Sequence, residues 1–441
     1  MGADERLKAV LPPSIAARGE ITLDAFLAPI RDVLNRRVFP DDSLSDEQLD
    51  ILLKLLSSMD TDKDPEAARV GEREARIASP FVGMLSSGFN HGIGRSGHVT
   101  AAQPKAPGAS LMQQVASSVA LDAIRKLGLG SVKGGFISPL STGMSIALTL
   151  AALRRTQGIR TVLYPRVDHE SPKRGIAMAG LKEMEIPTIL EGEAVCADLS
   201  ALTKAIKDNK AVAILATTTF FPPRESDPVK EIARLCQDAS IPFVINNAYG
   251  VQSNEVMKAI SSAIDAGRVD AIVQSSDKNF LTPVGASIVV SPHQESIEAI
   301  SETYAGRATA APVVQTLASL LSLGFSRYKA LQEEQKANKK YLECRLDEIA
   351  EEVSQRVLSV ENPVALAMTM DGLDVREIGG RLYNMRVTGP RAVEMGAYGS
   401  CIDDYPHSYI VMNSAIGATK SDVEKATTKL YKEVKGLLSE A

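Results

Sequence analysis

The feature that most constrains the fold is an alternation of short apolar runs with helical stretches between residues 66 and 310. Runs rich in β-branched residues predict strands, and amphipathic stretches between them predict helices. Strands that alternate with helices in this way are typical of a mostly parallel sheet covered by helices, so we predict an α/β fold. The predicted strands are Thr161–Tyr164, Thr188–Leu190, Val212–Thr217, Phe243–Asn246, Ala271–Gln274 and Ser287–Val290, and the predicted helices between them include Ser145–Arg154, Leu199–Asp208 and Pro228–Gln237.

Helical segments flank this alternating region on both sides. Ile21–Val38 is amphipathic, and Ser45 has the spacing of a capping box ahead of a second apolar run. Pro312–Glu352 predicts a long helix, and Ser421–Leu438 predicts a helix near the end of the chain. We therefore predict a helical N-terminal extension over 1–65, a large catalytic domain over 66–310, and a smaller α/β C-terminal domain over 311–441.

The composition is that of an ordinary globular protein, with 44% hydrophobic and 23% charged residues in a chain of 441. The 4 cysteines form no CxxC pair or Cys/His cluster, which argues against zinc and against a disulfide framework, and we expect a cytoplasmic location. The charged start MGADERLKAVLPP has no long apolar stretch, so we expect neither a signal peptide nor a membrane anchor. With a net charge of −5, any contact with RNA must come from local basic patches.

One lysine, Lys278, follows the predicted strand Ala271–Gln274 in the segment AIVQSSDKNFLTPVG. Partial burial at the mouth of an apolar run lowers the pKa of an amine and makes it nucleophilic. Lys278 is therefore a candidate for a Schiff base with a carbonyl compound. Taken alone, the segment is also compatible with a solvated lysine after a strand.

Two further segments place polar groups where an element begins or ends. In PLSTGMS, Pro139–Ser145, a loop of small residues opens a helix, and backbone amides with hydroxyl groups make a natural cradle for a phosphate. An ordinary helix cap would have the same residues. The strand that ends at Asn246 in VINNAYG marks an edge where ligands bind in such folds, although a strand-to-turn transition also uses Asn and Gly. The first segment has no GxGxxG and no Walker lysine, which disfavours a dinucleotide or a nucleoside triphosphate.

The segment Gly88–Gly108, GFNHGIGRSGHVTAAQPKAPG, is rich in glycine and has few apolar residues. Such a stretch cannot build a core, and a long loop of this kind is more often functional than accidental. Arg95 and Ser96 are flanked by glycines, so a guanidinium and backbone amides can converge on an anion there, and we favour anion binding over a simple flexible loop. His91 and His98 have no neighbouring carboxylate or cysteine in the sequence, and we predict no metal site.

Taken together, these segments resemble the fold-type I pyridoxal 5′-phosphate (PLP) enzymes, in which a TGM-like loop, a histidine after a strand, an Asn or Asp and the lysine follow in this order. More narrowly, the chain is similar to the O-phosphoseryl-tRNA(Sec):selenocysteinyl-tRNA synthase family. The resemblance extends from near residue 60 to the C-terminal region, and the N-terminal helices match only in general character. The motifs that carry it are VGERE (Val70–Glu74), HGIGRSG (His91–Gly97), AAQPKAPGAS (Ala101–Ser110), NNAYGVQS (Asn246–Ser253), DKNFLTPVG (Asp277–Gly285) and GRATAAP (Gly306–Pro312).

The resemblance implies a mostly parallel seven-stranded sheet with flanking helices, and PLP as the cofactor. Lys278 would bind PLP covalently, Asn246 would face the pyridine nitrogen, and His169 would stack on the ring. A neutral amide does not stabilise a full positive charge on that nitrogen, so the ring would be a weaker electron sink, which elimination of phosphate tolerates. The implied cofactor contacts are Ser141, Thr142, Gly143, Met144, His169, Asn246, Ser275, Lys278 and Arg73.

The implied reaction converts O-phosphoseryl-tRNA(Sec) to selenocysteinyl-tRNA(Sec). Lys278 would be the catalytic residue that takes the α-proton, phosphate would leave from the β-carbon, and selenophosphate would supply selenium. A phosphoseryl group carries nearly two negative charges at neutral pH, so its ligands should be cations and hydrogen-bond donors. The implied ligands of the substrate phosphate are Arg95, Ser96, Gln103 and Arg307.

The tRNA has to be held outside the pocket. Arg391, in VTGPR, is positioned like a family arginine that reads the acceptor end, and Arg36, Arg37, Lys425 and Lys429 are further candidates on helix faces. A charge run of this kind also fits a solvated helix face. The resemblance implies a homo-oligomer, a dimer of dimers, whose sites lie at a dimer interface.

Two alternatives remain at this point. One is a PLP-dependent lyase, desulfurase or decarboxylase that acts on a free amino acid, and the other is a catalytically inactive tRNA-binding protein on the same scaffold. The arginine-containing loop favours a phosphorylated substrate over the first. The joint presence of Lys278, Asn246 and the phosphate loop favours an enzyme over the second.

Overall fold

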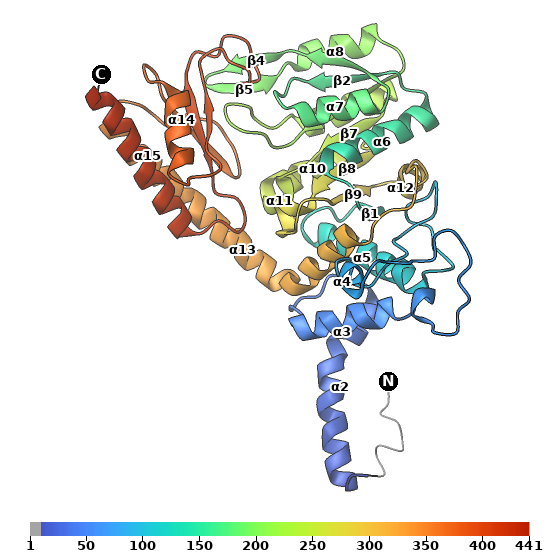
Figure 1. Ribbon diagram of the computed structural model, residues 1–441. Coiled ribbons are helices and arrows are strands. Elements are labelled where there is room, and N and C mark those ends of the chain that lie inside the picture. Colours follow the sequence, from blue (N-terminus) through green and yellow to red (C-terminus); the bar gives the residue numbers. More distant parts are fainter. Residues whose placement is uncertain (1–9, 441) are drawn as a thin grey trace.

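The computed structural model describes residues 10–440, so the charged start of the chain lies outside the described residues (Figure 1). Its centre is a seven-stranded sheet in the order β1-β9-β8-β7-β6-β2-β3, in which β9 is antiparallel to both neighbours and all other pairs are parallel. The predicted mostly parallel α/β sheet is confirmed. The strands are β1 Gly134–Ser138, β2 Thr161–Pro165, β3 Lys182–Ile186, β6 Val212–Thr217, β7 Phe243–Asn246, β8 Ala271–Ser275 and β9 Ser287–Ser291.

Five of the six predicted strands belong to this sheet. The sixth, Thr188–Leu190, is a strand, but it lies outside the large sheet: β4 (Thr188–Glu191) pairs only with β5 (Ala194–Ala197) in a separate hairpin. The sequence did not predict β1 or β3. β1 begins with two glycines, and β3 (KEMEI) is a charged strand at the sheet edge, so neither has the apolar run that marks a buried strand.

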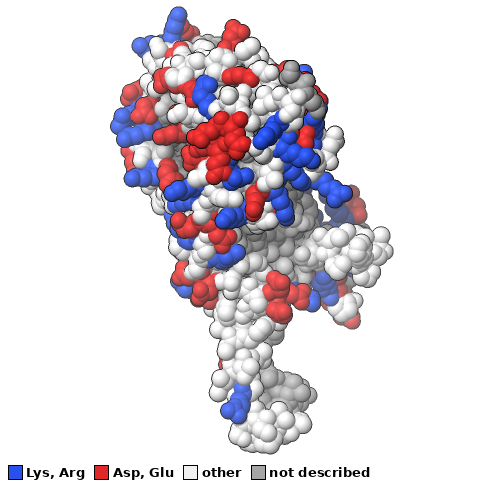
Figure 2. Space-filling model, turned by 90° about the vertical axis from the view of Figure 1, so that its left-hand side faces the viewer, with Lys and Arg blue, Asp and Glu red and all other residues white. Residues whose placement is uncertain are grey.

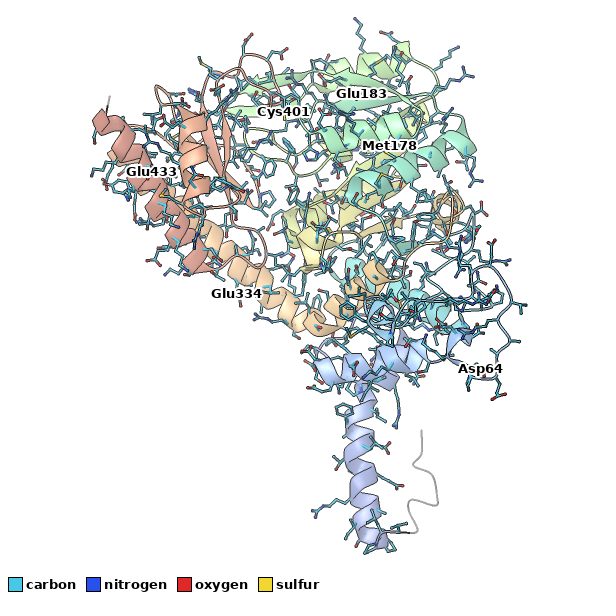
Figure 3. All side chains as sticks on the ribbon, viewed as in Figure 1. Asp64, Met178, Glu183, Glu334, Cys401 and Glu433 are labelled. Carbon is cyan, nitrogen blue, oxygen red and sulfur yellow. The ribbon has the colours of Figure 1, made fainter. Side chains whose placement is uncertain are left out.

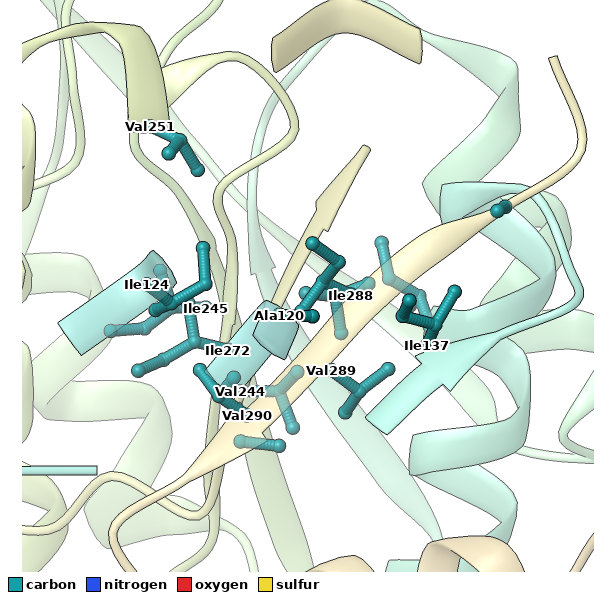
Figure 4. Close-up of a cluster of buried hydrophobic side chains, with 14 of the residues drawn as sticks. Ala120, Ile124, Ile137, Val244, Ile245, Val251, Ile272, Ile288, Val289 and Val290 are labelled. Atoms are coloured by element: carbon teal, nitrogen blue, oxygen red, sulfur yellow. The ribbon is translucent and has the colours of Figure 1, made fainter. Parts of the chain in front are cut away.

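The core lies where helix α5 (Pro107–Lys126) packs against the central strands. Every residue of β6, β7, β8 and β9 is buried. Figure 4 shows Ala120 and Ile124 of α5 beside strand residues such as Ile245 and Ile272. Each fully buried aliphatic side chain of this size contributes about 1.5–3 kcal/mol. This core positions the carboxyl ends of the central strands.

Helices that alternate with the strands cover the sheet, as predicted, and the helix predicted at Leu199–Asp208 has those bounds. A short helix, α11 (Ser276–Phe280), begins directly where β8 ends. The other elements of this region are α4 Pro80–Met84, α6 Thr142–Gln157, α7 Glu170–Met178, α8 Leu199–Asp208, α9 Val229–Ala239, α10 Asn254–Ala266 and α12 Gln294–Ser301, with 3-10 turns at Thr61–Lys63 and Gly250–Gln252.

The N-terminal extension contains two helices, α2 (Pro13–Arg36) and α3 (Asp46–Ser57). Figure 1 shows α2 projecting away from the body of the molecule, whereas α3 lies against it. The predicted capping box is present: the Ser45 hydroxyl accepts from the Gln48 backbone N–H, and the Gln48 side chain accepts from the Ser45 N–H.

Helix α13 (Ala311–Glu352) spans 42 residues and is kinked at Gly324, whose φ of 62° and ψ of 169° are not helical. The kink frees backbone groups that pair with the segment between α2 and α3. Phe325 N–H donates to the Pro40 carbonyl at 2.8 Å, and Leu44 N–H donates to the Leu321 carbonyl at 2.8 Å. A β-carbon at Gly324 would lie 2.7 Å from the Asp42 carbonyl carbon, so glycine permits this close approach.

A three-stranded antiparallel sheet, in the order β10-β12-β11, forms the C-terminal part with α14 and α15. It has its own hydrophobic cluster, which begins at Leu342 in α13, whereas the first half of α13 packs in the main core. The division at residues 65 and 310 stays a prediction. Among the described residues, no helix is both long enough and apolar enough to cross a membrane. The elements are β10 Ala365–Thr369, α14 Val375–Asn384, β11 Arg391–Val393, β12 Tyr409–Asn413 and α15 Lys420–Glu440.

Candidate active site

A pocket lies at the carboxyl edge of the parallel strands, where α/β folds bind ligands. Its walls come from the ends of β6 and β7, the segment after β2, and the first turns of α6 and α11. A larger cavity of about 810 Å³ lies between α13 and residues 358–363, and none of the predicted site residues lines it. The pocket is lined by Thr142, Gly143, Ile146, Val167, His169, Ser171, Pro172, Thr217, Thr219, Phe220, Asn246, Ala248, Tyr249 and Lys278.

Lys278 projects into this pocket from α11 and is half-buried. Its Nζ lies 4.2 Å from the centroid of the Tyr249 ring. The Gln252 side chain donates to the Lys278 carbonyl at 3.2 Å, and the Asn279 side chain donates to two backbone carbonyls, at 2.8 and 2.7 Å. The backbone on both sides of the amine is therefore fixed, as a covalent attachment point requires.

Asn246 ends β7 and is buried at 6% exposure. Its Nδ2 lies 3.4 Å from the Thr217 hydroxyl, whereas its Oδ1 has no hydrogen-bond partner. The hydroxyl of Thr219, on the same pocket wall, also has no partner. Buried polar atoms are normally paired, so unpaired ones at a pocket wall indicate a polar ligand. A protonated ring nitrogen would donate to this oxygen, and an uncharged one would accept from the NH₂ group if the amide were turned over, which leaves the oxygen to accept from the Thr217 hydroxyl.

The predicted phosphate loop opens α6. Thr142 and Gly143 line the pocket, and the free backbone N–H groups of a helix start attract an anion. A β-carbon at Gly143 would collide with Ser171 Oγ, so only glycine keeps this approach open. Ser141 and Met144 are exposed and do not line the pocket. A lysine amine, an unpaired amide oxygen and a helix start suited to a phosphate together fit PLP.

His169 lines the pocket one residue before α7 and caps that helix, since its Nδ1 accepts from the Ser171 N–H at 3.3 Å. Its ring stands edge-on to Phe220 with 6.0 Å between centroids. Burial, and then the positive charges of Lys278 and Arg391, lower the pKa of His169. The imidazole is therefore neutral near pH 7, which suits a ring that stacks on another ring.

Arg391 reaches the same region from β11 of the C-terminal part. Its guanidinium carbon lies 5.6 Å from the Phe220 centroid and 5.3 Å from the Phe221 centroid. Phe220 lines the pocket, so a cation of the C-terminal part lies beside it. Ser275, by contrast, does not line the pocket, and its hydroxyl donates to the Asp277 carboxylate.

A second group of charged residues gathers around the glycine-rich segment. An antiparallel bridge between Ile93 and Ala308 brings Arg307 beside that segment, and Arg307 donates to the His91 carbonyl. Burial, and then the positive charge of Arg73, lower the pKa of Arg307. We call Arg73, Glu74, His91, Lys105 and Arg307 the loop cluster.

Within the loop cluster Lys105 forms an ion pair with Glu74. Arg95 and Ser96 are exposed, and the Gln103 N–H donates to the Ser110 hydroxyl at 2.9 Å. None of the predicted phosphate ligands, nor Arg73, is among the described residues that line the Lys278 pocket. Two groups that the sequence assigned to one site are thus separate within a single chain.

The predicted tRNA contacts differ in their surroundings. Arg36 pairs with Asp32 at 3.2 Å, and Lys429 Nζ donates to the Met385 carbonyl at 2.7 Å. Arg37, just after α2, and Lys425 of α15 are exposed. Figure 2 shows basic and acidic residues intermingled on the face that bears the C-terminal part.

His98 has carboxylate neighbours that the sequence did not predict. Its Nε2 lies 2.8 Å from Glu298, and Glu302 is close enough to complete a group of three potential metal ligands, the one such group among residues 10–440. Glu302 also pairs with Arg155 at 3.2 Å. Ion pairing accounts for these contacts, and we assign no metal to them.

Sequence reasoning missed nine of the pocket residues, among them Thr217, Thr219, Phe220 and Tyr249. The strand that ends at Thr217 was predicted, and the carboxyl ends of parallel strands meet at one edge. That rule pointed to Thr217 and the residues after it. Tyr249 lies within the NNAYGVQS motif, but nothing in the sequence indicated that its ring lies beside the lysine amine.

The fold and the pocket define a fold-type I PLP enzyme. The structure of Oryza sativa TDC with PLP and tryptamine matches with a TM-score of 0.60 at 14% identity, over 97% of this chain and 98% of that chain, which shows the fold alone. The chain belongs to the O-phosphoseryl-tRNA(Sec) selenium transferase (SepSecS) family, whose model matches residues 59–435.

Two relatives match along nearly their whole length. The chain is 42% identical to the O-phosphoseryl-tRNA(Sec) selenium transferase of Methanococcus maripaludis, over 97% of this chain and 99% of the relative. The crystal structure of an archaeal enzyme of this name matches with a TM-score of 0.95 and 42% identity, over 98% of this chain and 100% of that chain. The predicted family, the class of PLP-dependent transferase and the PLP cofactor are confirmed.

Proposed function

We propose that this protein converts O-phosphoseryl-tRNA(Sec) to selenocysteinyl-tRNA(Sec) at the pocket around Lys278, with selenophosphate as the selenium donor. One observation carries the proposal: the Lys278 amine and the unpaired, buried amide oxygen of Asn246 belong to one pocket at the carboxyl edge of the sheet. Membership of the selenium transferase family supports this reaction over a lyase or desulfurase, and over an inactive RNA-binding protein.

PLP, when bound, would supply an electron sink for the negative charge that develops at the α-carbon of the phosphoseryl group. We assign its covalent attachment to Lys278, its phosphate to Thr142 and Gly143 at the start of α6, and its ring nitrogen to Asn246. As a neutral amide, Asn246 does not support a full positive charge on that nitrogen. Phosphate is a good leaving group, and its elimination tolerates a weaker sink.

We assign removal of the α-proton to Lys278. Its amine is held over the Tyr249 ring at 4.2 Å, while Gln252 and Asn279 fix the backbone around it. A base held in place loses little entropy when it meets the proton, and this lowers the barrier to transfer. Phosphate then leaves from the β-carbon, the selenium of selenophosphate adds at the same carbon, and the α-carbon takes back a proton. Water cleaves the P–Se bond, so that the phosphoryl group of selenophosphate leaves as a second phosphate.

The substrate phosphate carries nearly two negative charges, and we assign it to Arg95, Ser96, Gln103 and Arg307, with Arg73 nearby. Because these residues do not line the pocket of their own chain, we propose that the loop cluster of one protomer, together with Arg95, Ser96 and Gln103, completes the pocket of another. Exposed apolar side chains near that loop support a homo-oligomer, which a dimer of dimers would satisfy: Phe81, Met84 and Leu85 are 63%, 64% and 64% exposed.

We assign the acceptor end of the tRNA to Arg391, because its guanidinium lies against Phe220 at the pocket. Arg37 and Lys425 are exposed and free to meet phosphates farther along the tRNA, whereas Arg36 and Lys429 would first have to leave the partners that they have. If these cations bind tRNA phosphates, the affinity should fall steeply with salt, and substitution should flatten that slope.

We also propose that the protein acts in the cytoplasm. All four cysteines are free thiols in the structure, and free thiols are the usual state of cysteine in a reducing compartment. The chain would there encounter an aminoacylated tRNA.

The decisive experiment supplies the PLP-loaded protein with phosphoseryl-tRNA(Sec) and selenophosphate and measures selenocysteinyl-tRNA(Sec), with free phosphoserine as the comparison substrate. Lys278→Ala should abolish turnover and the labelling of position 278 by borohydride reduction. Lys258→Ala, which removes an exposed lysine of α10, is the matched control and should leave both unchanged. Product formation by Lys278→Ala at the wild-type rate would remove this pocket from the reaction.

A further inference from the structure

The C-terminal part contacts the pocket region through the loop 399–403. Asp168 binds this loop at Gly399 and Cys401, and Cys401 is labelled in Figure 3. Asp168 is 2% exposed and directly precedes His169 of the pocket. Its Oδ2 accepts from the backbone N–H groups of Gly399 at 2.7 Å and Cys401 at 2.9 Å. Its Oδ1 accepts from Arg166 Nε at 2.9 Å.

These contacts hold the carboxylate in its charged form. Burial alone would raise the pKa of Asp168, but hydrogen bonds from Arg166, Gly399 and Cys401 outweigh it, so the pKa lies below its usual value. Bonds from N–H groups to a carboxylate are stronger than those between neutral groups. An asparagine at position 168 would have one acceptor oxygen instead of two, and its NH₂ group would face one of these N–H donors instead of accepting from it.

The docked loop also limits where Arg391 can lie. Gly399 has a φ of 129°, and a β-carbon there would lie 2.7 Å from Arg391 Nη2, so the guanidinium passes directly over this glycine. On its other side Arg391 rests near the rings of Phe220 and Phe221. Asp168 fixes Gly399, and Gly399 together with the two rings fixes the guanidinium.

We propose that Asp168 is a positioning residue that holds Arg391 beside the Lys278 pocket and so sets the affinity for the tRNA-linked substrate. This inference rests on the proposed role of Arg391 at the acceptor end. A guanidinium recognises phosphates and base edges through a planar fork of donors, and a loss of orientation costs it binding. Asp168 makes no direct contact with the substrate in this scheme, and it acts on binding rather than on the chemical step.

The test uses Asp168→Asn in the full-length, PLP-loaded protein. KM for phosphoseryl-tRNA(Sec) should rise about tenfold while kcat stays within about twofold, because one charge-assisted contact is lost outside the chemistry. Borohydride labelling at Lys278 should persist. Combined with Arg391→Ala, the substitution should add almost nothing to the effect of Arg391→Ala alone. Additive effects, or an unchanged KM, would overturn the proposal.

Asp403→Asn is the matched control on the same loop. Asp403 is 87% exposed and pairs with Arg166 at 2.8 Å, and a carboxylate that stays in water contributes little through such a pair, so KM should stay within about twofold. A tenfold rise with this variant would show that any disturbance of the loop suffices, and would overturn the specific role of Asp168.

Thr188→Val covers the case in which Asp168→Asn does not fold. The Thr188 hydroxyl donates to the Cys401 carbonyl at 2.6 Å, so this variant loosens the same loop from another side. Amide exchange at Gly399 and Cys401 should become faster, and KM should rise; faster exchange with an unchanged KM would overturn the proposal. If the wild-type protein itself fails to turn over phosphoseryl-tRNA(Sec), the proposed function fails, and direct tRNA binding to the same variants then decides the role of Asp168.

Discussion

The Lys278 pocket and the loop cluster differ in how far their polar groups are already paired. In the pocket, the Asn246 amide oxygen and the Thr219 hydroxyl are buried without partners. In the loop cluster, Arg307 Nε and His91 Nδ1 are also buried without partners, but Lys105 is paired with Glu74, and Arg307 donates to the His91 carbonyl. A polar ring that enters the pocket therefore only gains hydrogen bonds there, whereas an anion at the loop cluster gains a donor and also competes with the Lys105–Glu74 ion pair.

The largest expected effect tests the loop cluster. Arg307→Ala should lower kcat/KM for phosphoseryl-tRNA(Sec) by about 100-fold or more, because a lost donor to a charged group in an active site costs this much. Single-turnover assays of the PLP-loaded protein would measure it. Arg327→Ala, which removes an arginine that pairs with Glu334 on α13, is the control and should stay near the wild-type rate. Unchanged activity of Arg307→Ala would remove Arg307 from the site.

The next effect tests whether the pocket is made for a neutral partner. Asn246→Asp should lower the free energy of unfolding of the PLP-free protein by about 1–3 kcal/mol, because it buries an unpaired charge where an amide now lies. PLP should recover part of this loss. Urea titrations with and without PLP would show both. Asn254→Asp is the control, since Asn254 Oδ1 already accepts from Lys329 and an aspartate keeps that contact. Equal stability of the two variants would contradict the burial argument.

A smaller effect concerns the start of α6. Gly143→Ala should weaken PLP binding about tenfold, because the added carbon meets the Ser171 hydroxyl and crowds the phosphate. Ser171→Ala in the same chain should restore part of the affinity. Gly130→Ala is the control, because a β-carbon there has open space. Absorbance titration with PLP measures all three, and equal affinities would show that the phosphate does not lie at Gly143.

The smallest effect is a pH dependence of the loop cluster. Burial, partly opposed by Asp62, lowers the pKa of His91 in the folded protein. As the pH falls below about 6.5, His91 takes up a proton in the unfolded chain but not yet in the folded protein. The free energy of unfolding therefore decreases until the pH reaches the lowered pKa of folded His91. Asp60, with its pKa raised by burial, acts in the opposite direction.

His91→Gln should therefore lose less stability than the wild-type protein between pH 7 and 5, by about 1 kcal/mol or less. Urea midpoints at both pH values give the difference, and Asp60 cancels because both chains contain it. Parallel curves would contradict a neutral, buried His91.

The sequence predicted those parts of the fold whose residues alone reveal their surroundings. The strands β6 to β9 are apolar runs buried on both faces, and each was predicted. β1 and β3 could not be predicted, because glycine and charged residues form strands only when a neighbouring strand supplies the pairing. For β4 the strand was predicted, but the local pattern does not say which strand becomes its partner.

For the site, the sequence predicted residues and the fold decided which of them meet. Lys278, Asn246, His169, Thr142 and Gly143 converge on one pocket, because the carboxyl ends of parallel strands share an edge. The assignments of Ser141, Met144 and Ser275 to the cofactor stay predictions, and these three do not line the pocket. The spacing of motifs along a chain does not show whether two of them meet within one chain or between two.

The kink at Gly324 has a consequence for how the molecule comes apart. Helix α13 contributes residues to both hydrophobic clusters, and the backbone at its kink forms hydrogen bonds with the segment between α2 and α3. A chain cut at residue 310 would lose from the seven-stranded sheet the apolar side chains of α13 that cover it. It would also lose the hydrogen bonds between α13 and the segment that joins α2 to α3. We therefore expect the N-terminal helices, the seven-stranded sheet and the C-terminal part to unfold in one thermal transition, and neither fragment of the cut chain to fold alone.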